Sequence, residues 1–174
     1  MVTNLKSQTR QAKLFEIILL TLLGVLMYVS QVIMSQLPNI EIVSLLIIIT
    51  TCVFGVKAVC SVYIFVICEI FTYGLGIWTI NYLYVWAILW FTILLFRKNA
   101  DKWTVTLVSA IFGLSFDVFC SIPYFFIGGI GGGLSYIVAG FWFNILHCIG
   151  NFTVAFLLFE PLKRILENTI NKYR

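Results

Sequence analysis

Long apolar runs separated by short breaks fill most of the chain and restrict it to one class of fold. An apolar stretch of about 20 residues crosses a bilayer as an α-helix, because backbone N–H and C=O groups in lipid must pair within their own segment. The chain is 61% hydrophobic and only 10% charged, which is outside the range of soluble domains. We therefore expect an all-α membrane protein, a bundle of six transmembrane helices at about 14–34, 41–56, 58–75, 78–96, 103–126 and 137–159.

The breaks between these runs contain the residues that end helices. Short connections of this kind make neighbouring helices antiparallel. The glycine run predicts a flexible loop on the outer side. The breaks are Leu37–Asn39, Gly55–Lys57, Gly74–Gly76, Arg97–Lys102 and the glycine run Gly128–Gly133.

Lysine and arginine all lie in alternate connections and at the two ends of the chain. Basic residues in short loops stay on the cytoplasmic side, so this pattern predicts that both termini are cytoplasmic. It also identifies the positive net charge as a signature of membrane orientation, not of nucleic-acid binding. We expect a cytoplasmic segment over 1–13, a transmembrane substrate-binding domain over 14–165 and a cytoplasmic tail over 166–174, in a prokaryotic plasma membrane.

Ionisable side chains within the predicted spans are the candidates for function. Such groups are costly in lipid and usually face the bundle interior, where they pair or contact a ligand. Glu69, Asp117 and His147 all fall in the outer half of the predicted bilayer. We expect them to meet around one cavity that is open to the outside.

Other polar and aromatic residues fall on the same helix faces or near the same helix ends. Asn144, His147 and Asn151 follow an i, i+3, i+7 pattern, and Tyr73 shares a face with Glu69. With Asp117 they predict a pocket with aromatic walls and a few hydrogen-bonding groups. Its remaining members are Trp78, Asn81, Tyr82, Tyr84 and Trp142.

Structural roles explain several of these residues equally well. Tyrosine and tryptophan at helix ends form interfacial belts, and buried asparagines bond neighbouring helices. His147 has Asp117 as a possible structural partner. Near the cytoplasmic ends, surface pairs are expected for Glu16 with Lys13 and for Glu160 with Lys163.

Motifs for catalysis and for nucleotide binding are missing. The chain has no GxxxxGK[ST] loop for ATP phosphates, and its single histidine excludes an HExxH zinc site. Gly113–Phe116 only partly matches an intramembrane serine-protease motif. Five cysteines within apolar segments, without a CxxC pair, predict buried free thiols. We expect no enzyme activity and no cofactor, and any use of ATP requires a partner.

Three segments resemble one known family. They are 37–44 (LPNIEIVS), 78–84 (WTINYLY) and 139–163, which contains the HxxGN pattern of residues 147–151 and a late proline. They are similar to the S components of energy-coupling factor (ECF) vitamin transporters, which are six-helix substrate-binding membrane subunits.

This resemblance implies a function and partners. The chain would capture a vitamin or related micronutrient from outside and associate with a membrane scaffold subunit and two cytoplasmic ATPases. The resemblance adds Glu41 to the candidate substrate-binding residues. The aromatic walls and the acidic residues favour a small aromatic heterocycle with amine or cationic character. Two alternatives stay open: a proton- or ion-coupled secondary transporter, and a purely structural assembly subunit.

Overall fold

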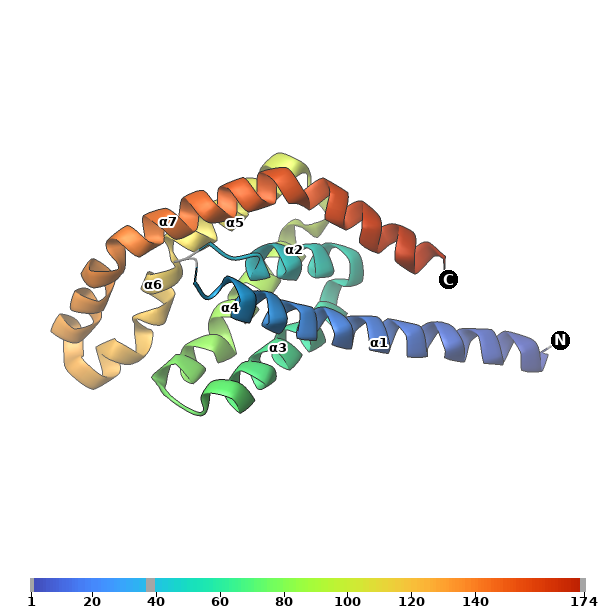
Figure 1. Cartoon of the computed structure of the whole chain (residues 1–174), viewed down its shortest axis with the longest axis horizontal. Coiled ribbons are helices and arrows are strands. Elements are labelled where there is room, and N and C mark those ends of the chain that lie inside the picture. Colours follow the sequence, from blue (N-terminus) through green and yellow to red (C-terminus); the bar gives the residue numbers. More distant parts are fainter. Residues whose placement is uncertain (1, 37–39, 173–174) are drawn as a thin grey trace.

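The computed structural model describes residues 2–36 and 40–172, and every regular element in these ranges is helical (Figure 1). This confirms the all-helical class. The elements, in chain order, are α1 (Val2–Met34), α2 (Val43–Phe54), η1 (Gly55–Lys57), α3 (Ala58–Tyr73), α4 (Ile77–Phe96), η2 (Arg97–Asn99), α5 (Lys102–Leu114), α6 (Phe116–Cys120) and α7 (Ile122–Asn171).

Four helical stretches in the described residues are long and apolar enough to cross a membrane: Arg10–Met34, Val43–Tyr73, Ile77–Asn99 and Ile122–Asn171. The second combines α2, η1 and α3, and Figure 1 shows the chain turning back at η1. The 12 residues of α2 extend only about 18 Å, which is less than the hydrocarbon core of a bilayer. The structure therefore supports a membrane protein, and the number of spans stays a prediction.

Apart from the glycine run, the predicted breaks coincide with helix ends wherever they are described. Gly55 ends α2 with a φ of 62°, and Gly74 ends α3 with a φ of 75°. A side chain at Gly55 would also collide with the Arg97 guanidinium. The predicted break at Leu37–Asn39 lies outside the described residues.

The prediction of a flexible loop over Gly128–Gly133 is wrong. The stretch belongs to α7, and within it only Gly129 departs from helical geometry, with φ 64° and ψ −162°. Figure 1 shows the chain reversing here. A Cβ atom at Gly133 would collide with the Phe125 ring, and one at Gly132 would lie 3.0 Å from the Tyr124 carbonyl oxygen, so these two glycines allow two helical arms to approach closely. Gly129 instead supplies the positive φ at the reversal, and Gly128 and Gly131 have open space around them.

Several predicted boundaries fall inside continuous helices. The helix α7 passes Pro161 and ends at Asn171, well beyond the predicted end at 159. The limits proposed at residues 13 and 165 also lie within α1 and α7, so the division into segments stays a prediction. The predicted span 103–126 is instead interrupted at Ser115 and Ser121.

The short central helix α2 lies in the core of the bundle. Ile47 and Ile48 have no exposed surface, and they share this core with Phe65 and Trp86. Close backbone contact replaces side-chain packing between α1 and α3, where a Cβ at Gly24 would lie 2.6 Å from the Ser61 carbonyl oxygen. Such contacts matter in membranes because helix association there depends on packing and hydrogen bonds.

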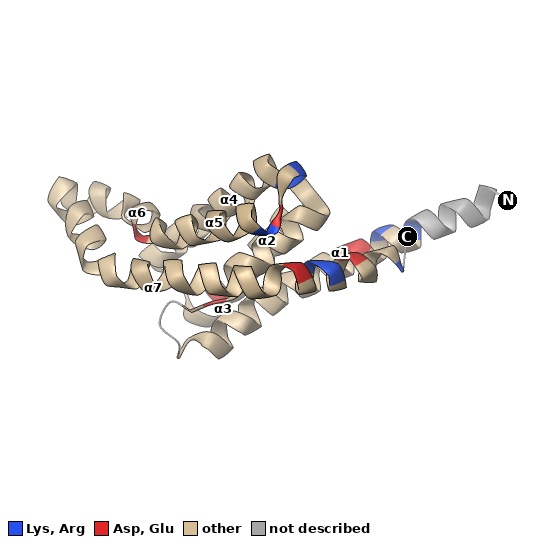
Figure 2. Cartoon of the chain, turned by 90° about the horizontal axis from the view of Figure 1, so that it is seen from above, with Lys and Arg blue, Asp and Glu red and all other residues tan. Residues whose placement is uncertain are grey.

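Charged side chains gather at the end of the bundle that carries both termini (Figures 1 and 2). Glu16 pairs with Lys57 on η1, where Nζ and Oε2 are 2.7 Å apart, and not with Lys13 as predicted. Lys163 lies 3.9 Å from Glu167, one turn further along α7, and not beside Glu160. The predicted surface pairs were therefore wrong in their partners, because the contacts depend on how the helices cross and on which side chains share a helix face.

Candidate functional site

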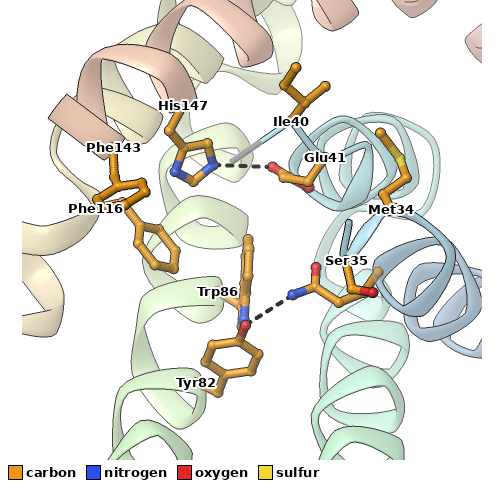
Figure 3. A pocket seen from close by; sticks show the side chains of 10 residues that line it. Met34, Ser35, Ile40, Glu41, Tyr82, Trp86, Phe116, Phe143 and His147 are labelled. Atoms are coloured by element: carbon orange, nitrogen blue, oxygen red, sulfur yellow. Dashed lines mark hydrogen bonds and ion pairs between the residues drawn. The ribbon is translucent and has the colours of Figure 1, made fainter. Parts of the chain in front are cut away.

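A cavity of about 360 Å³ lies between the end of α1, the residues before α2, and the helices α4, α6 and α7 (Figure 3). We call it the ring cavity. It is bounded on one side by aromatic side chains and on the other by polar and aliphatic ones. Its lining residues are Gln31, Met34, Ser35, Ile40, Glu41, Tyr82, Trp86, Phe116, Phe143 and His147.

A ladder of aromatic rings along α4 forms one wall. Trp78, Tyr82 and Trp86 follow each other one helical turn apart, with centroid distances of 5.3 Å and 5.5 Å between successive rings. The rings meet edge to face, a favourable arrangement of aromatic pairs. Gln31 on α1 donates a hydrogen bond of 3.1 Å from Nε2 to the Tyr82 hydroxyl. This bond fixes the polar edge of the wall.

Glu41 and His147 face each other across the cavity (Figure 3). His147 Nε2 lies 3.4 Å from Glu41 Oε1, and both side chains are largely buried. The other carboxylate oxygen accepts a hydrogen bond of 2.8 Å from the Ser44 amide in the first turn of α2, where the helix dipole favours negative charge. The carboxylate within 4 Å of the His147 imidazole is therefore that of Glu41, and not that of Asp117, which was the alternative structural partner.

One buried donor on the wall of the ring cavity lacks a protein partner. Trp86 Nε1 is buried and makes no hydrogen bond with any described residue. A buried polar group without a partner costs about 1–3 kcal/mol. An acceptor on a bound molecule would remove this cost.

A second cavity, of about 330 Å³, lies beside the first, and we call it the Asp117 cavity. Phe116, Phe143 and His147 line both cavities and form the wall between them. Beside this wall, Asn144 on α7 accepts a hydrogen bond of 3.3 Å from the backbone amide of Asp117, which connects α7 to α6. The members that line only this cavity are Asp117, Tyr136, Ala139, Gly140 and Asn144.

The predicted site residues are therefore only partly brought together. Glu41 and His147 line the ring cavity, while Asp117, Asn144 and His147 line the Asp117 cavity. Glu69 is 4% exposed and lines neither cavity. A single cavity around Glu69, Asp117 and His147 does not form.

Six other predicted residues line neither cavity. Asn151 is buried beneath His147 and donates to Ser44 Oγ at 3.3 Å and to the Ser109 carbonyl at 3.2 Å. The Tyr84 hydroxyl lies 2.7 Å from the Phe119 carbonyl and 3.0 Å from Asn81 Oδ1, which connects α4 to α6. Tyr73 and Trp142 are 55% and 73% exposed. Trp78 contacts the ring cavity only through Tyr82.

Several lining residues were missed by reasoning from the sequence. Trp86 could have been found, because it continues the stripe of Trp78 and Tyr82 at the same helical spacing. Phe143 lies one turn before His147 on the same helix face, so helical spacing could have identified it as well. No sequence pattern identifies Met34, Ser35 and Ile40. They lie on either side of the break between α1 and α2, and they line the cavity because of the way the chain folds there.

The described residues contain no group of three or more His, Cys, Asp or Glu side chains that could hold a metal ion. All five cysteines are free thiols, but only Cys120 is buried and Cys60 is exposed, so the prediction of uniform burial is wrong. Comparison of the chain with models of protein families, with curated proteins and with solved structures finds no match.

Proposed function

We propose that this chain is a six-span membrane protein with cytoplasmic termini that captures a small aromatic heterocycle with amine or cationic character in the ring cavity. One observation carries the proposal: the cavity places a carboxylate and an imidazole opposite a ladder of aromatic rings. This combination suits a planar ring that carries hydrogen-bonding groups.

Each wall of the ring cavity offers a separate contact to such a ligand. The ring stacks against Tyr82 or Trp86, and the Trp86 indole N–H donates to an acceptor on the ring. The Glu41 carboxylate accepts from an amine and balances a positive charge. A neutral aliphatic molecule of the same size would leave the Trp86 N–H without a partner and would offer no donor to Glu41, so it would bind weakly.

The transport role follows from the resemblance to ECF S components and from the lack of a nucleotide-binding loop in the sequence. We propose that a membrane scaffold subunit and two cytoplasmic ATPases drive uptake of the captured molecule. Both termini and most basic residues lie at one end of the bundle, and basic residues favour the cytoplasmic side, which supports the proposed orientation.

Binding is tested on the purified full chain in detergent. Native mass spectrometry is expected to detect a co-purified small aromatic compound. Glu41→Gln should weaken its affinity at least tenfold, because a buried contact with a charged group is worth about 1.5–3 kcal/mol. Glu160→Gln, which changes an exposed glutamate, serves as the control. Equal affinities in the wild type and in Glu41→Gln would contradict the proposed site.

Transport is tested by reconstituting the chain in vesicles with an ECF scaffold and its two ATPases. Uptake of the retained compound should require ATP and all four subunits. Binding without any ATP-driven uptake would remove the transport role and leave the binding role.

A second candidate is a proton- or ion-coupled carrier, and Glu69 favours it. This carboxyl group is buried on α3, and its Oε1 atom has no hydrogen-bond partner among the described residues. Buried acids in spans often carry protons or ions. Vesicles that contain only this chain would take up ligand along an ion gradient, and Glu69→Gln would abolish that uptake. No uptake without ATPases would dismiss this candidate.

A further inference from the structure

Three aromatic side chains surround the Asp117 cavity: Phe116, Tyr136 and Phe143. Two of them are fixed by neighbouring rings. Tyr136 stacks on Tyr124 at a centroid distance of 4.3 Å, and Phe116 lies 5.0 Å from the His147 ring. The faces and edges of these rings therefore have defined positions around the cavity.

The Asp117 carboxylate lines the cavity together with these aromatic rings, and its position is set by contacts of Asp117 with α7. It lies against Gly140 on α7, where a Cβ atom would overlap Oδ2. Asn144 binds the backbone amide of Asp117 and not its carboxylate. Among the described residues, no hydrogen bond or ion pair involves the Asp117 carboxylate oxygens.

We propose that the Asp117 cavity binds an organic ammonium group. Aromatic rings attract such cations through their electron-rich faces, and the carboxylate supplies the opposite charge. A neutral group would leave a carboxylate uncompensated in a low-dielectric site, which is costly. Gly140 makes room for the carboxylate and so provides part of the site.

The shared wall relates this site to the ring cavity. His147, Phe116 and Phe143 line both cavities, so the ammonium site and the ring cavity are direct neighbours. The relation between the two rests on the proposed function, since it places a second site for a cation beside the one proposed for the captured molecule.

The test compares choline with its neutral analogue 3,3-dimethylbutan-1-ol, titrated calorimetrically into the purified full chain. Both molecules have the same shape, so the difference between them isolates the charge. Choline is expected to bind at least tenfold more tightly. This comparison uses only the wild-type protein, and equal affinities for the two compounds would overturn the proposal.

Asp117→Asn should remove the preference for choline, because it keeps the shape of the side chain and loses its charge. The matched control is Asp101→Asn, which makes the same change at an exposed position at the start of α5 and should retain the preference. Circular dichroism checks that both variants remain helical. A preference that survives in Asp117→Asn would also overturn the proposal.

Glu41→Gln separates this inference from the proposed function. It should weaken binding of the co-purified aromatic compound and leave the choline preference intact, because Glu41 lines only the ring cavity. If choline is preferred but no ATP-driven uptake occurs, the ammonium site stands and the transport role falls. If uptake occurs and choline is not preferred, the reverse conclusion holds.

Discussion

The two ends of the bundle differ in how their charged side chains are paired. At the end that carries the termini, Arg97 donates hydrogen bonds of 2.8 Å and 2.9 Å to the Cys52 and Val53 carbonyls, and Lys57 pairs with Glu16. In the last turns of α3, Glu69 is buried and its Oε1 atom has no hydrogen-bond partner in the described residues. Charged side chains therefore fix the turns at the first end, whereas the buried carboxyl group near the second lacks such a contact.

The strongest effect expected from this contrast concerns Arg97. Replacing it with alanine removes two charge-assisted hydrogen bonds to the last carbonyls of α2. We expect the free energy of unfolding to fall by about 1.5 kcal/mol, the lower end of the usual range because the side chain is exposed. Titration with SDS in mixed micelles, followed by circular dichroism, measures it. Lys98→Ala, at an exposed neighbour, should change stability by less than about 0.5 kcal/mol. Equal losses of stability in Arg97→Ala and Lys98→Ala would contradict a structural role of Arg97.

A change at the opposite end should have the opposite sign. Glu69→Met replaces a buried carboxyl group with an apolar side chain of similar volume. We expect the free energy of unfolding to rise by about 1 kcal/mol, because a buried charge without full compensation is often better replaced in this way. The same SDS titration measures the change. A loss of stability would mean that Glu69 has a structural partner, and the contrast between the two ends would then fail.

The ion pair between Glu16 and Lys57 should contribute less. Its lysine is 62% exposed, and exposed pairs are worth little. Glu16→Gln should lower stability by about 0.5 kcal/mol at low ionic strength, and by less as salt is added. Unfolding at two salt concentrations tests this, with Glu160→Gln as the control. A loss that does not depend on salt would point to packing instead of charge.

The smallest effect is a dependence of stability on pH at Asp101. This residue caps α5, where Thr104 donates to it through its backbone amide at 3.1 Å, and hydrogen bonds from Thr104 hold its pKa below the usual value of 3.8. Because the pKa is lower in the folded state, the stabilisation is present above 3.8 and is lost as the pH falls below it. Thermal unfolding from neutral to acidic pH should show a smaller acid loss for Asp101→Asn than for the wild type. Identical pH profiles would contradict this.

The helices and most turns could be predicted because their causes are local. Gly55 and Gly74 adopt backbone conformations that favour glycine, and apolar runs without charges have few alternatives to helix. The run Gly128–Gly133 misled because the same residues that permit flexibility also permit close packing. The contact between Gly133 and the Phe125 ring shows close packing, and this contact forms only when the two helical arms come together in the fold.

The candidate site was predicted less well, since its contacts join distant segments. Helical spacing correctly placed Asn144 and His147 on one face of α7. It gave no indication that Glu41, 106 residues earlier, would contact the imidazole. Spacing also could not show that Glu69 faces a different part of the bundle from Asp117. Depth in the bilayer is readable from sequence, but the neighbour across the interior is not.

The ring cavity and the Asp117 cavity share one wall, so a change in that wall alters the volume of both. Any side chain shortened in that wall enlarges both spaces at once, and a shorter residue at Phe143 would merge them into one. A single substitution in this shared wall would therefore change the size of molecule that fits in either cavity, while the helices around the cavities stay the same.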